Sequence, residues 1–418
     1  MDAAAVVPPR PTGVRRAALA FIFVTVLLDI LAFGMMIPVL PHLIASFYGG
    51  NLSKAAVTHG IFASVFMVMQ FACSPIQGAL SDRFGRRPVI LLSNLGLGLD
   101  FILMAVAQTL PLLFIGRVLS GITSASFSTA NAYIADVTPP DKRAAAFGKI
   151  GMAFGIGFVI APAIGGWLGG IGPRWPFWVA AVLSLTNFCY GLLVLPESLP
   201  AERRAPFSWK RANPVASLGF LSHHPEVFAL AGTVLLMQLA HMVYPSTFVL
   251  YADYRFGWGS NMVGYTLAIV GVLSAVVQGL LISRAIKRWG ERRTLLLGLG
   301  FGTIGFTLYG FAPTGGWFWA AMPIAALWGL AMPAAQGLMT RQVAATEQGR
   351  LQGAVGSLAS LAGIAGPLLF TGAFADITRR HLHSGWAGIT FWMAAAMLLG
   401  GFVLAWRATR RDALPALA

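Results

Sequence analysis

The chain has 418 residues, of which 57% are hydrophobic and only 10% are charged, and its formal net charge is +15. This composition lies far from the average of soluble globular proteins and favours a protein embedded in a lipid bilayer. The two cysteines, Cys73 and Cys189, fit neither a disulfide framework nor a metal site. No nucleophile–base constellation or phosphate-binding glycine loop is visible, so we expect neither an enzyme nor a cofactor.

Twelve apolar runs follow one another along the chain, each long enough to cross a bilayer. They cover residues 17–41, 56–80, 89–107, 110–135, 147–170, 176–195, 226–250, 262–283, 294–312, 317–340, 351–375 and 386–406. The first run is too long for a cleavable signal peptide and contains an acid. Between the sixth and seventh runs lies a polar, basic linker, residues 196–225. The sequence predicts an all-α membrane protein with two six-helix bundles, residues 1–195 and 226–418.

The two halves repeat each other. Gly85 and Pro162 recur 205 residues later as Gly290 and Pro367. A duplicated apolar half is typical of carriers, in which the substrate path lies between pseudo-symmetric halves.

The distribution of the cations predicts the orientation of the chain in the membrane. The N-terminal tail, the even-to-odd connections and the C-terminal tail hold 23 of the 29 Lys and Arg residues. Because cytoplasmic loops are enriched in these residues, we expect both termini in the cytoplasm. The positive charge then reflects topology, and we expect no nucleic-acid partner, since no basic face with interleaved aromatics lies outside these loops.

Two acids fall deep inside predicted spans, Asp29 in the first and Asp100 in the third. Each lies about 11–12 residues from the cytoplasmic end, or roughly 17 Å at 1.5 Å per residue, which is near the bilayer midplane. A carboxyl group there is costly and is usually retained for ion coupling or substrate contact. The alternative is a protonated, hydrogen-bonded structural acid.

Other polar side chains in the spans are candidates for proton or substrate contacts. His241 lies near mid-depth in the seventh span, where an imidazole could carry a proton or pack by a hydrogen bond. Arg117 lies early in the fourth span, toward the periplasmic side, and needs a partner. Five amides either line a cavity or bridge helices. They are Gln70, Asn131, Gln238, Gln278 and Gln336.

The cytoplasmic charges repeat with exchanged signs. Arg86 and Asp136 are 50 residues apart, and so are their repeat mates Glu291 and Arg341. The charges exchange sign between the halves while their positions are kept, which favours two ion pairs over a solvated charged face. Asp82 is expected near the first pair. Pairs at these loops are expected to bias the equilibrium between outward- and inward-facing states.

Four segments resemble motifs of the major facilitator superfamily. Gly78–Pro88, which contains Asp82, Arg83, Gly85 and Arg86, is similar to its signature loop between helices 2 and 3. Leu28–Gly34 is similar to the helix 1 pattern of its drug/proton antiporters. Leu113–Gly121 resembles their helix 4 motif, whose arginine, here Arg117, is implicated in proton transfer. Gly157–Gly166 resembles the helix 5 antiport motif, and the resemblance implies a role for Gly157, Pro162, Gly165 and Gly166.

Within this superfamily the chain resembles the tetracycline efflux group over nearly its whole length. Asp29 and Asp100 match that group's membrane acids in helices 1 and 3. The sequence departs from the group in the C-terminal half, at residues tied to drug and proton handling. Phe301 occupies a position where that group has an acid, Ser274 a position where it has a histidine, and Met242 a position where it has a glutamine.

The combined expectation is a twelve-helix major facilitator fold in a bacterial inner membrane. It exports an amphipathic compound against protons by alternating access, with a small-molecule substrate, protons and the lipid bilayer as its partners, and it acts as a monomer. The first alternative is a proton-coupled importer or a metabolite exporter on the same fold. The second is a non-transporting membrane receptor or scaffold.

Overall fold

The computed structural model describes residues 12–124, 126–139, 142–207, 219, 225–344, 347–380 and 385–410. Every regular element within these residues is a helix, and ten stretches among them are long and apolar enough to cross a membrane. One of the ten, Ser260–Phe311, has 52 residues and leaves helical geometry at Gly290, where φ is 76°. Counted as two, and with the shorter apolar helix Leu110–Thr123, it accounts for the twelve expected runs. The predicted all-α membrane fold is confirmed.

The first half of the chain contains eight α-helices among its described residues. They are α1 (Thr12–Met36), α2 (Leu40–Ser46), α3 (Leu52–Phe84), α4 (Arg86–Val106), α5 (Leu110–Thr123), α6 (Ser126–Val137), α7 (Arg143–Ile171) and α8 (Trp175–Val194). The first expected run divides into α1 and α2, because Pro41 in the first turn of α2 has no N–H to continue a preceding helix. Of the expected linker, residues 208–218 and 220–224 lie outside the described residues.

The second half is more interrupted. Its helices are α10 (Pro225–His241), α11 (Val249–Phe256), α12 (Ser260–Val276), α13 (Ile282–Phe311), α14 (Gly315–Ala326), α15 (Ala331–Thr340), α16 (Gln348–Arg380) and α17 (Ile389–Arg410). Short 3₁₀ turns occur in it at Leu327–Leu330 and Gly385–Gly388, and a further one, Ala201–Arg203, lies in the linker. Two π-helical turns, Tyr244–Phe248 and Val277–Leu281, interrupt the seventh and eighth spans. The first contains Pro245, which cannot donate to the regular helical ladder, and such turns often mark functional sites.

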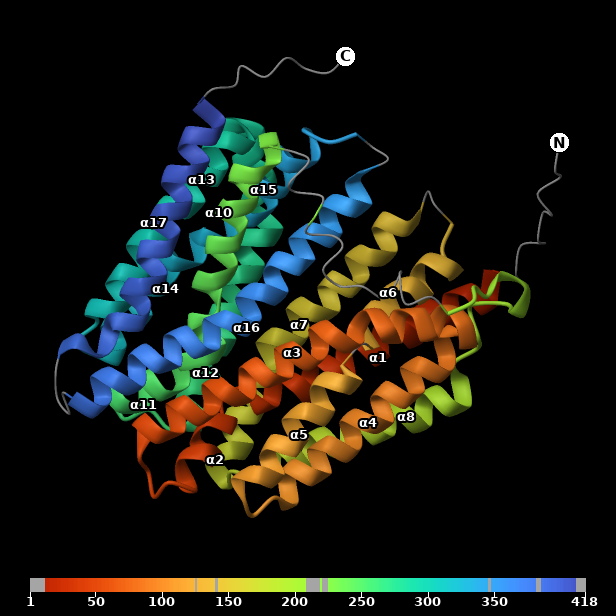
Figure 1. Ribbon diagram of the computed structural model, residues 1–418, viewed down its shortest axis with the longest axis horizontal. Helices are drawn as coiled ribbons and strands as arrows, with labels where there is room; N and C mark the ends of the chain where they lie inside the picture. Colours follow the sequence, from red (N-terminus) through yellow and green to blue (C-terminus); the bar gives the residue numbers. More distant parts are fainter. Residues whose placement is uncertain are drawn as a thin grey trace.

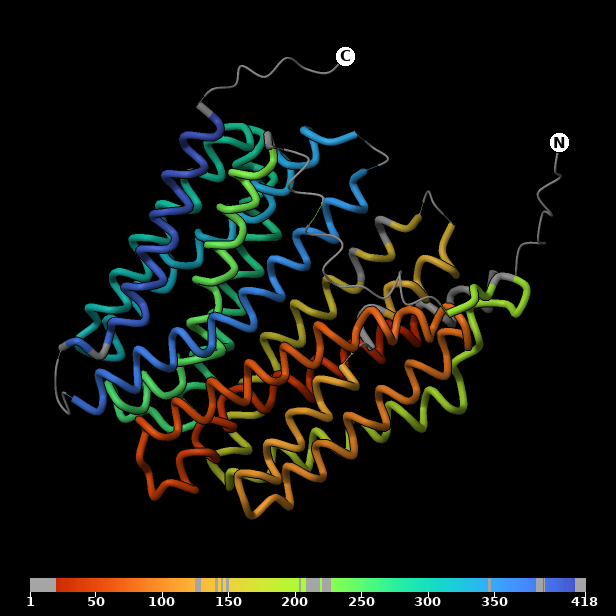
Figure 2. Tube along the Cα trace, in the orientation of Figure 1, coloured from red at the N-terminus to blue at the C-terminus, as the bar shows by residue number. Residues whose placement is uncertain are grey.

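The two halves form two bundles that meet along two helix pairs (Figure 1). Helix α3 packs against α16, and α7 packs against α12. The bundles come together near α2 and α11 and diverge toward the ends where α1 begins and α17 ends, as the Cα trace in Figure 2 also shows. We call the divergent ends the termini side and the opposite ends the far side.

Glycines on the contact faces show where the halves separate. On α7, a side-chain carbon at Gly166 would lie 2.8 Å from the Cα of Gly264 in the other half. On the same face of α7, nearer the termini side, Gly155 and Gly151 have no atom of another residue within 4 Å of that position. Gly356 of α16 likewise faces open space. The interface is therefore closed on the far side and open on the termini side.

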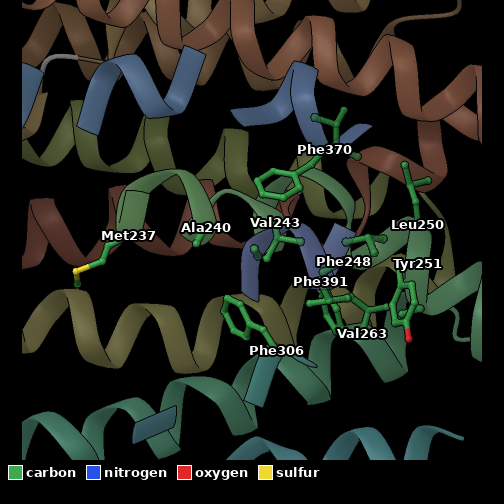
Figure 3. Close-up of a cluster of buried hydrophobic side chains, with 14 of the residues drawn as sticks. Met237, Ala240, Val243, Phe248, Leu250, Tyr251, Val263, Phe306, Phe370 and Phe391 are labelled. Carbon is green, nitrogen blue, oxygen red and sulfur yellow. The ribbon is translucent and has the colours of Figure 1, made fainter. Parts of the chain in front are cut away.

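The core of the second half is aromatic and tightly packed. Figure 3 shows Phe306, Phe391 and Tyr251 in contact with aliphatic side chains of the seventh span. The Phe306 and Phe391 ring centroids are 6.2 Å apart, and those of Tyr251 and Phe391 are 5.0 Å apart. Buried aromatic pairs contribute beyond their area alone. Helix α10 itself packs against α15, α16 and α17 of the second half, and the π-helical turn that follows it contacts α3 of the first half.

Candidate functional site

Asp100 and Arg117 form a buried ion pair between α4 and α5. Arg117 Nη2 lies 3.2 Å from Asp100 Oδ2, and it also donates to Ser120 Oγ at 3.4 Å. The guanidinium carbon is 5.7 Å from the centroid of the Phe66 ring. Gly116 makes this approach possible, because a Cβ there would lie 2.8 Å from Asp100 Oδ1. The sequence analysis proposed these two residues separately, and the structure brings them together.

Asp29 has a different partner. Asn187 of α8 donates to Asp29 Oδ1 at 3.1 Å and to the carbonyl oxygen of Thr25 at 3.1 Å. Asp29 is 4% exposed and Asn187 is fully buried. The carboxylate is thus held against a neutral amide, whereas that of Asp100 is held against a cation. Sequence reasoning did not find Asn187. The signal that could have found it is its polar amide in the middle of the apolar run 176–195.

His241 lies on the exposed face of α10, at the end of that helix. Its ring centroid is 5.6 Å from that of Trp328 and 6.3 Å from that of Tyr244. Four residues further on, the carbonyl oxygen of Pro245 accepts a hydrogen bond of 3.0 Å from Nε2 of His59, which belongs to the first half. This face of the seventh span therefore looks toward the first half.

The five candidate amides are spread over both halves. Asn131 and Gln278 are exposed, whereas Gln70, Gln238 and Gln336 are half-buried. Within the described part of the chain, no hydrogen bond joins any two of them. Their assignment to a common cavity stays a prediction.

The expected cytoplasmic pair of the first half is present. Arg86 Nε lies 3.1 Å from Asp136 Oδ2, and Arg86 Nη1 lies 2.5 Å from Asp82 Oδ1. Gly85, with a φ of 108°, forms the turn that lets α4 begin directly after α3. The carboxylate of Glu197 accepts from the backbone N–H of Arg86 at 2.8 Å, at the start of α4. Sequence reasoning missed Glu197, whose anionic group complements the dipole at that helix N-terminus.

The matching pair of the second half is present as well. Arg341 Nη2 lies 3.0 Å from Glu291 Oε1, directly after the positive-φ residue Gly290. A Cβ at Gly337 would lie 2.7 Å from the same carboxylate oxygen, so a glycine is needed beside it. Both pairings predicted from the duplicated sequence are confirmed, and their role in switching stays a proposal.

The glycines of the helix 5 motif lie where α7 touches its neighbours. A Cβ at Gly157 would meet Ile30 of α1 at 2.5 Å, and one at Gly165 would meet the Cα of Met35 at 2.5 Å. Gly166 instead faces α12 of the other half. Pro162 lies inside α7, and its carbonyl oxygen is close to Gly264. The motif therefore serves close packing on two sides, within the first half and across the interface.

Two histidines that the sequence analysis did not select join the halves on the far side. His59 is 6% exposed, and its contact to Pro245 is described above. His42 Nε2 of α2 lies 3.6 Å from Asp253 Oδ2 of α11, and His42 Nδ1 lies 3.1 Å from Ser260 Oγ. Pairing residues from distant parts of the sequence needs knowledge of how the halves dock, which the sequence alone did not provide.

Comparison with known proteins identifies close relatives. The sequence matches the family described as Major Facilitator Superfamily over residues 22–367 and 256–417. It is 39% identical over 385 residues to the tetracycline resistance protein, class C, of Escherichia coli, covering 91% of this chain and 94% of that protein. It is 34% identical over 399 residues to the class B protein of Escherichia coli, with 91% and 94% coverage.

Solved structures share the fold. The human organic anion transporter MFSD10 (TETRAN) superimposes with a TM-score of 0.67 at 24% identity, covering 95% of this chain and 100% of that chain. A bacterial homolog of the human lysosomal transporter Spinster, in an inward-facing and unoccupied conformation, superimposes with a TM-score of 0.76 at 17% identity, covering 96% and 98%. At these identities the likeness is one of fold.

Proposed function

Because this chain belongs to the Major Facilitator Superfamily, we propose that it exports an amphipathic, drug-like compound in exchange for protons. The chain is a multi-pass membrane transporter that resembles the tetracycline efflux group, and it is not an enzyme. We place it in the bacterial inner membrane, with both termini in the cytoplasm, where it acts as a monomer.

The observation that carries the proton coupling is the burial of two carboxyl groups at mid-depth. Asp29 and Asp100 are 4% and 1% exposed and lie in different helices of the first half. A scaffold or receptor has no need to bury ionisable groups in a bilayer, where each is costly. Protonation of Asp100 would remove its charge and so weaken its attraction to Arg117. Proton binding and the arrangement of this ion pair are thereby linked.

The arrangement of the halves supports alternating access as the transport cycle. We assign the structure to an inward-facing state, because the open space lies on the termini side, which we propose faces the cytoplasm. In the opposite state the far-side contacts part and protons from outside reach Asp29 and Asp100. One proton moving inward down a potential of about 100 mV contributes roughly 2.3 kcal/mol. The charge pairs at Arg86 and Glu291 bias the equilibrium between the two states.

The relatives named above are tetracycline resistance proteins, but the cargo of this chain differs in our proposal. Phe301, Ser274 and Met242 replace an acid, a histidine and a glutamine of that group. Met242 packs against Gly366, where a Cβ would lie 2.5 Å from that of Met242, so its side chain serves helix packing. We therefore expect weak or no tetracycline export.

A drug-accumulation assay in an efflux-deficient host tests the proposal. Cells expressing the chain are compared with cells expressing the Asp29→Asn variant, across tetracyclines, neutral amphiphiles and organic ions. We expect at least one compound to accumulate less in cells that express the wild-type chain than in cells that express the variant. Adding this compound should also cause protons to enter the wild-type cells. Greater accumulation than in empty cells would indicate an importer. High-level tetracycline resistance would contradict the proposed change of cargo.

A further inference from the structure

Helix α10 has two faces with different surroundings. Met237 and Ala240 of α10 are buried in the second half at 1% and 0% exposure, and Val243, just after the helix, is 0% exposed beside Phe306 and Phe391 (Figure 3). His241, by contrast, is exposed. It lies four residues before Pro245, or about 6 Å nearer the termini side at 1.5 Å per residue. The Pro245 carbonyl contacts His59 of the first half. His241 therefore lies on the termini side of that contact, where the halves begin to separate.

His241 there forms an aromatic shelf with Tyr244 and Trp328. The His241 and Trp328 rings are inclined by 38° with centroids 5.6 Å apart, and Trp328 is supported from behind by Phe306 at 5.4 Å. The indole N–H of Trp328 has no hydrogen-bond partner among the described residues, although it is buried. A donor left unpaired in this way is unfavourable, and an acceptor on a bound ligand would satisfy it. Within the described residues the His241 ring contacts the rings of Trp328 and Tyr244 and forms no hydrogen bond.

Among the described residues, no exposed carboxylate at this depth is open to contact with a bound cation. The acids at this depth are Asp29 and Asp100, which are 4% and 1% exposed. Asp29 accepts a hydrogen bond from the neutral amide of Asn187, and Asp100 is paired with Arg117. An organic cation that loses its water at the shelf would therefore contact neither carboxylate, which is costly. The termini-side loops, with most of the 29 Lys and Arg residues, create a potential that attracts anions and repels cations.

We propose that the aromatic shelf is the cargo-binding surface, and that it selects flat, conjugated compounds that are neutral or anionic and carry an acceptor oxygen. Such a compound stacks on the exposed imidazole ring of His241 and accepts from the indole N–H of Trp328. An organic cation of the same shape is disfavoured. The inference rests on the proposed function for the identity of this compound as the cargo.

Two dyes with the same xanthene ring system and opposite charge test the proposal. Fluorescein and rhodamine 123 are titrated with the purified protein, and fluorescence anisotropy gives their dissociation constants. We expect fluorescein to bind about tenfold more tightly than rhodamine 123, which corresponds to about 1.4 kcal/mol. Equal or tighter binding of rhodamine 123, or no measurable binding of either dye, would overturn the inference.

Variants locate the binding surface. Trp328→Phe keeps an aromatic side chain, although a smaller one, and removes the donor, and should weaken fluorescein binding about fivefold, as expected for one hydrogen bond. His241→Ala changes an exposed side chain without opening the core and should weaken it at least as much. Trp319→Phe is the matched control, because its indole N–H is already engaged with Thr266 Oγ1 at 3.0 Å. Fluorescein affinity within twofold of wild type in both shelf variants would contradict the proposal.

One further variant separates this inference from the proposed function. Asp29→Asn should bind fluorescein within twofold of wild type, because Asp29 is not part of the aromatic shelf, while proton-driven export is lost. If that variant still exports uphill, the coupling proposal fails and the binding result stands by itself. If it exports nothing and the shelf variants bind normally, the aromatic shelf is wrong and the coupling proposal stands.

Discussion

Arg117 Nη2 lies 3.2 Å from Asp100 Oδ2, and the two side chains are 3% and 0% exposed. The pair brings two charges into the membrane interior as one unit. Each charge is tolerated because the other is present, so the two residues have to be considered together in any substitution.

Removing one member of the Asp100–Arg117 pair should therefore be worse than removing both. We expect Arg117→Met to lower the free energy of unfolding by about 3–5 kcal/mol, because it leaves an unpaired buried carboxylate. Arg117→Met combined with Asp100→Leu should recover most of that loss and remain inactive in transport. Denaturant unfolding in detergent measures the first quantity. A double variant as unstable as the single one would show that the two charges act independently.

Asp29→Asn should fold and insert, because an amide resembles a protonated carboxyl group and can still pair with Asn187. It should abolish uphill export while leaving downhill movement of cargo measurable. Proton-loaded vesicles, with and without a pH gradient, distinguish the two. Asn187→Ala is the informative companion, since it removes the donor but keeps the acid and should reduce export only partly. Uphill export at the wild-type rate by Asp29→Asn would assign Asp29 a structural role.

The Glu291–Arg341 pair tests whether transport needs only opposite charges at these two positions, whichever residue carries each sign. Exchanging Glu291 and Arg341 should preserve more transport than Glu291→Arg or Arg341→Glu alone, because only the exchange keeps opposite charges 3.0 Å apart. In this partly exposed place the pair contributes about 0–1 kcal/mol, enough to shift populations between two states. Initial export rates of the three variants decide the matter. If the exchange is as damaging as the single reversals, Glu291 has a role beyond pairing.

His59 Nε2 donates a hydrogen bond to the Pro245 carbonyl across the two halves, and another side chain can supply a similar donor. His59→Phe keeps the ring size and removes the donor to Pro245, so the far side should open more often. His59→Gln can place its amide N–H near the same carbonyl and should restore closure. With Cys73 and Cys189 replaced, cross-linking between cysteines introduced at Ser53 and Ala375 reports closure, because Ser53 Oγ donates to the Ala375 carbonyl at 2.9 Å. Equal cross-linking in both variants would contradict the prediction.

The sequence predicted what depends on local composition and on the repeat. The burial of Asp29 and Asp100 inside long helices followed from their place within apolar runs, and the ion pairs of Arg86 and Glu291 followed from equal spacing in both halves. The partner of Asp29 did not follow, because it depends on which faces of α1 and α8 meet. The π-helical turn at Tyr244–Phe248 was also not predicted, although Pro245 marks its position.

The contact between α7 and α12 includes one point, at Gly166 and Gly264, where main chain lies against main chain. Rotation of one half against the other at that point requires no side chain to change rotamer. Elsewhere along the same helix pair Val159 projects its side chain toward Gly271, and hydrogen bonds such as Ser64 to the Ile364 carbonyl also join the halves. We therefore expect the rate of the proposed transport cycle to depend on these side-chain and hydrogen-bond contacts more than on the glycine contact.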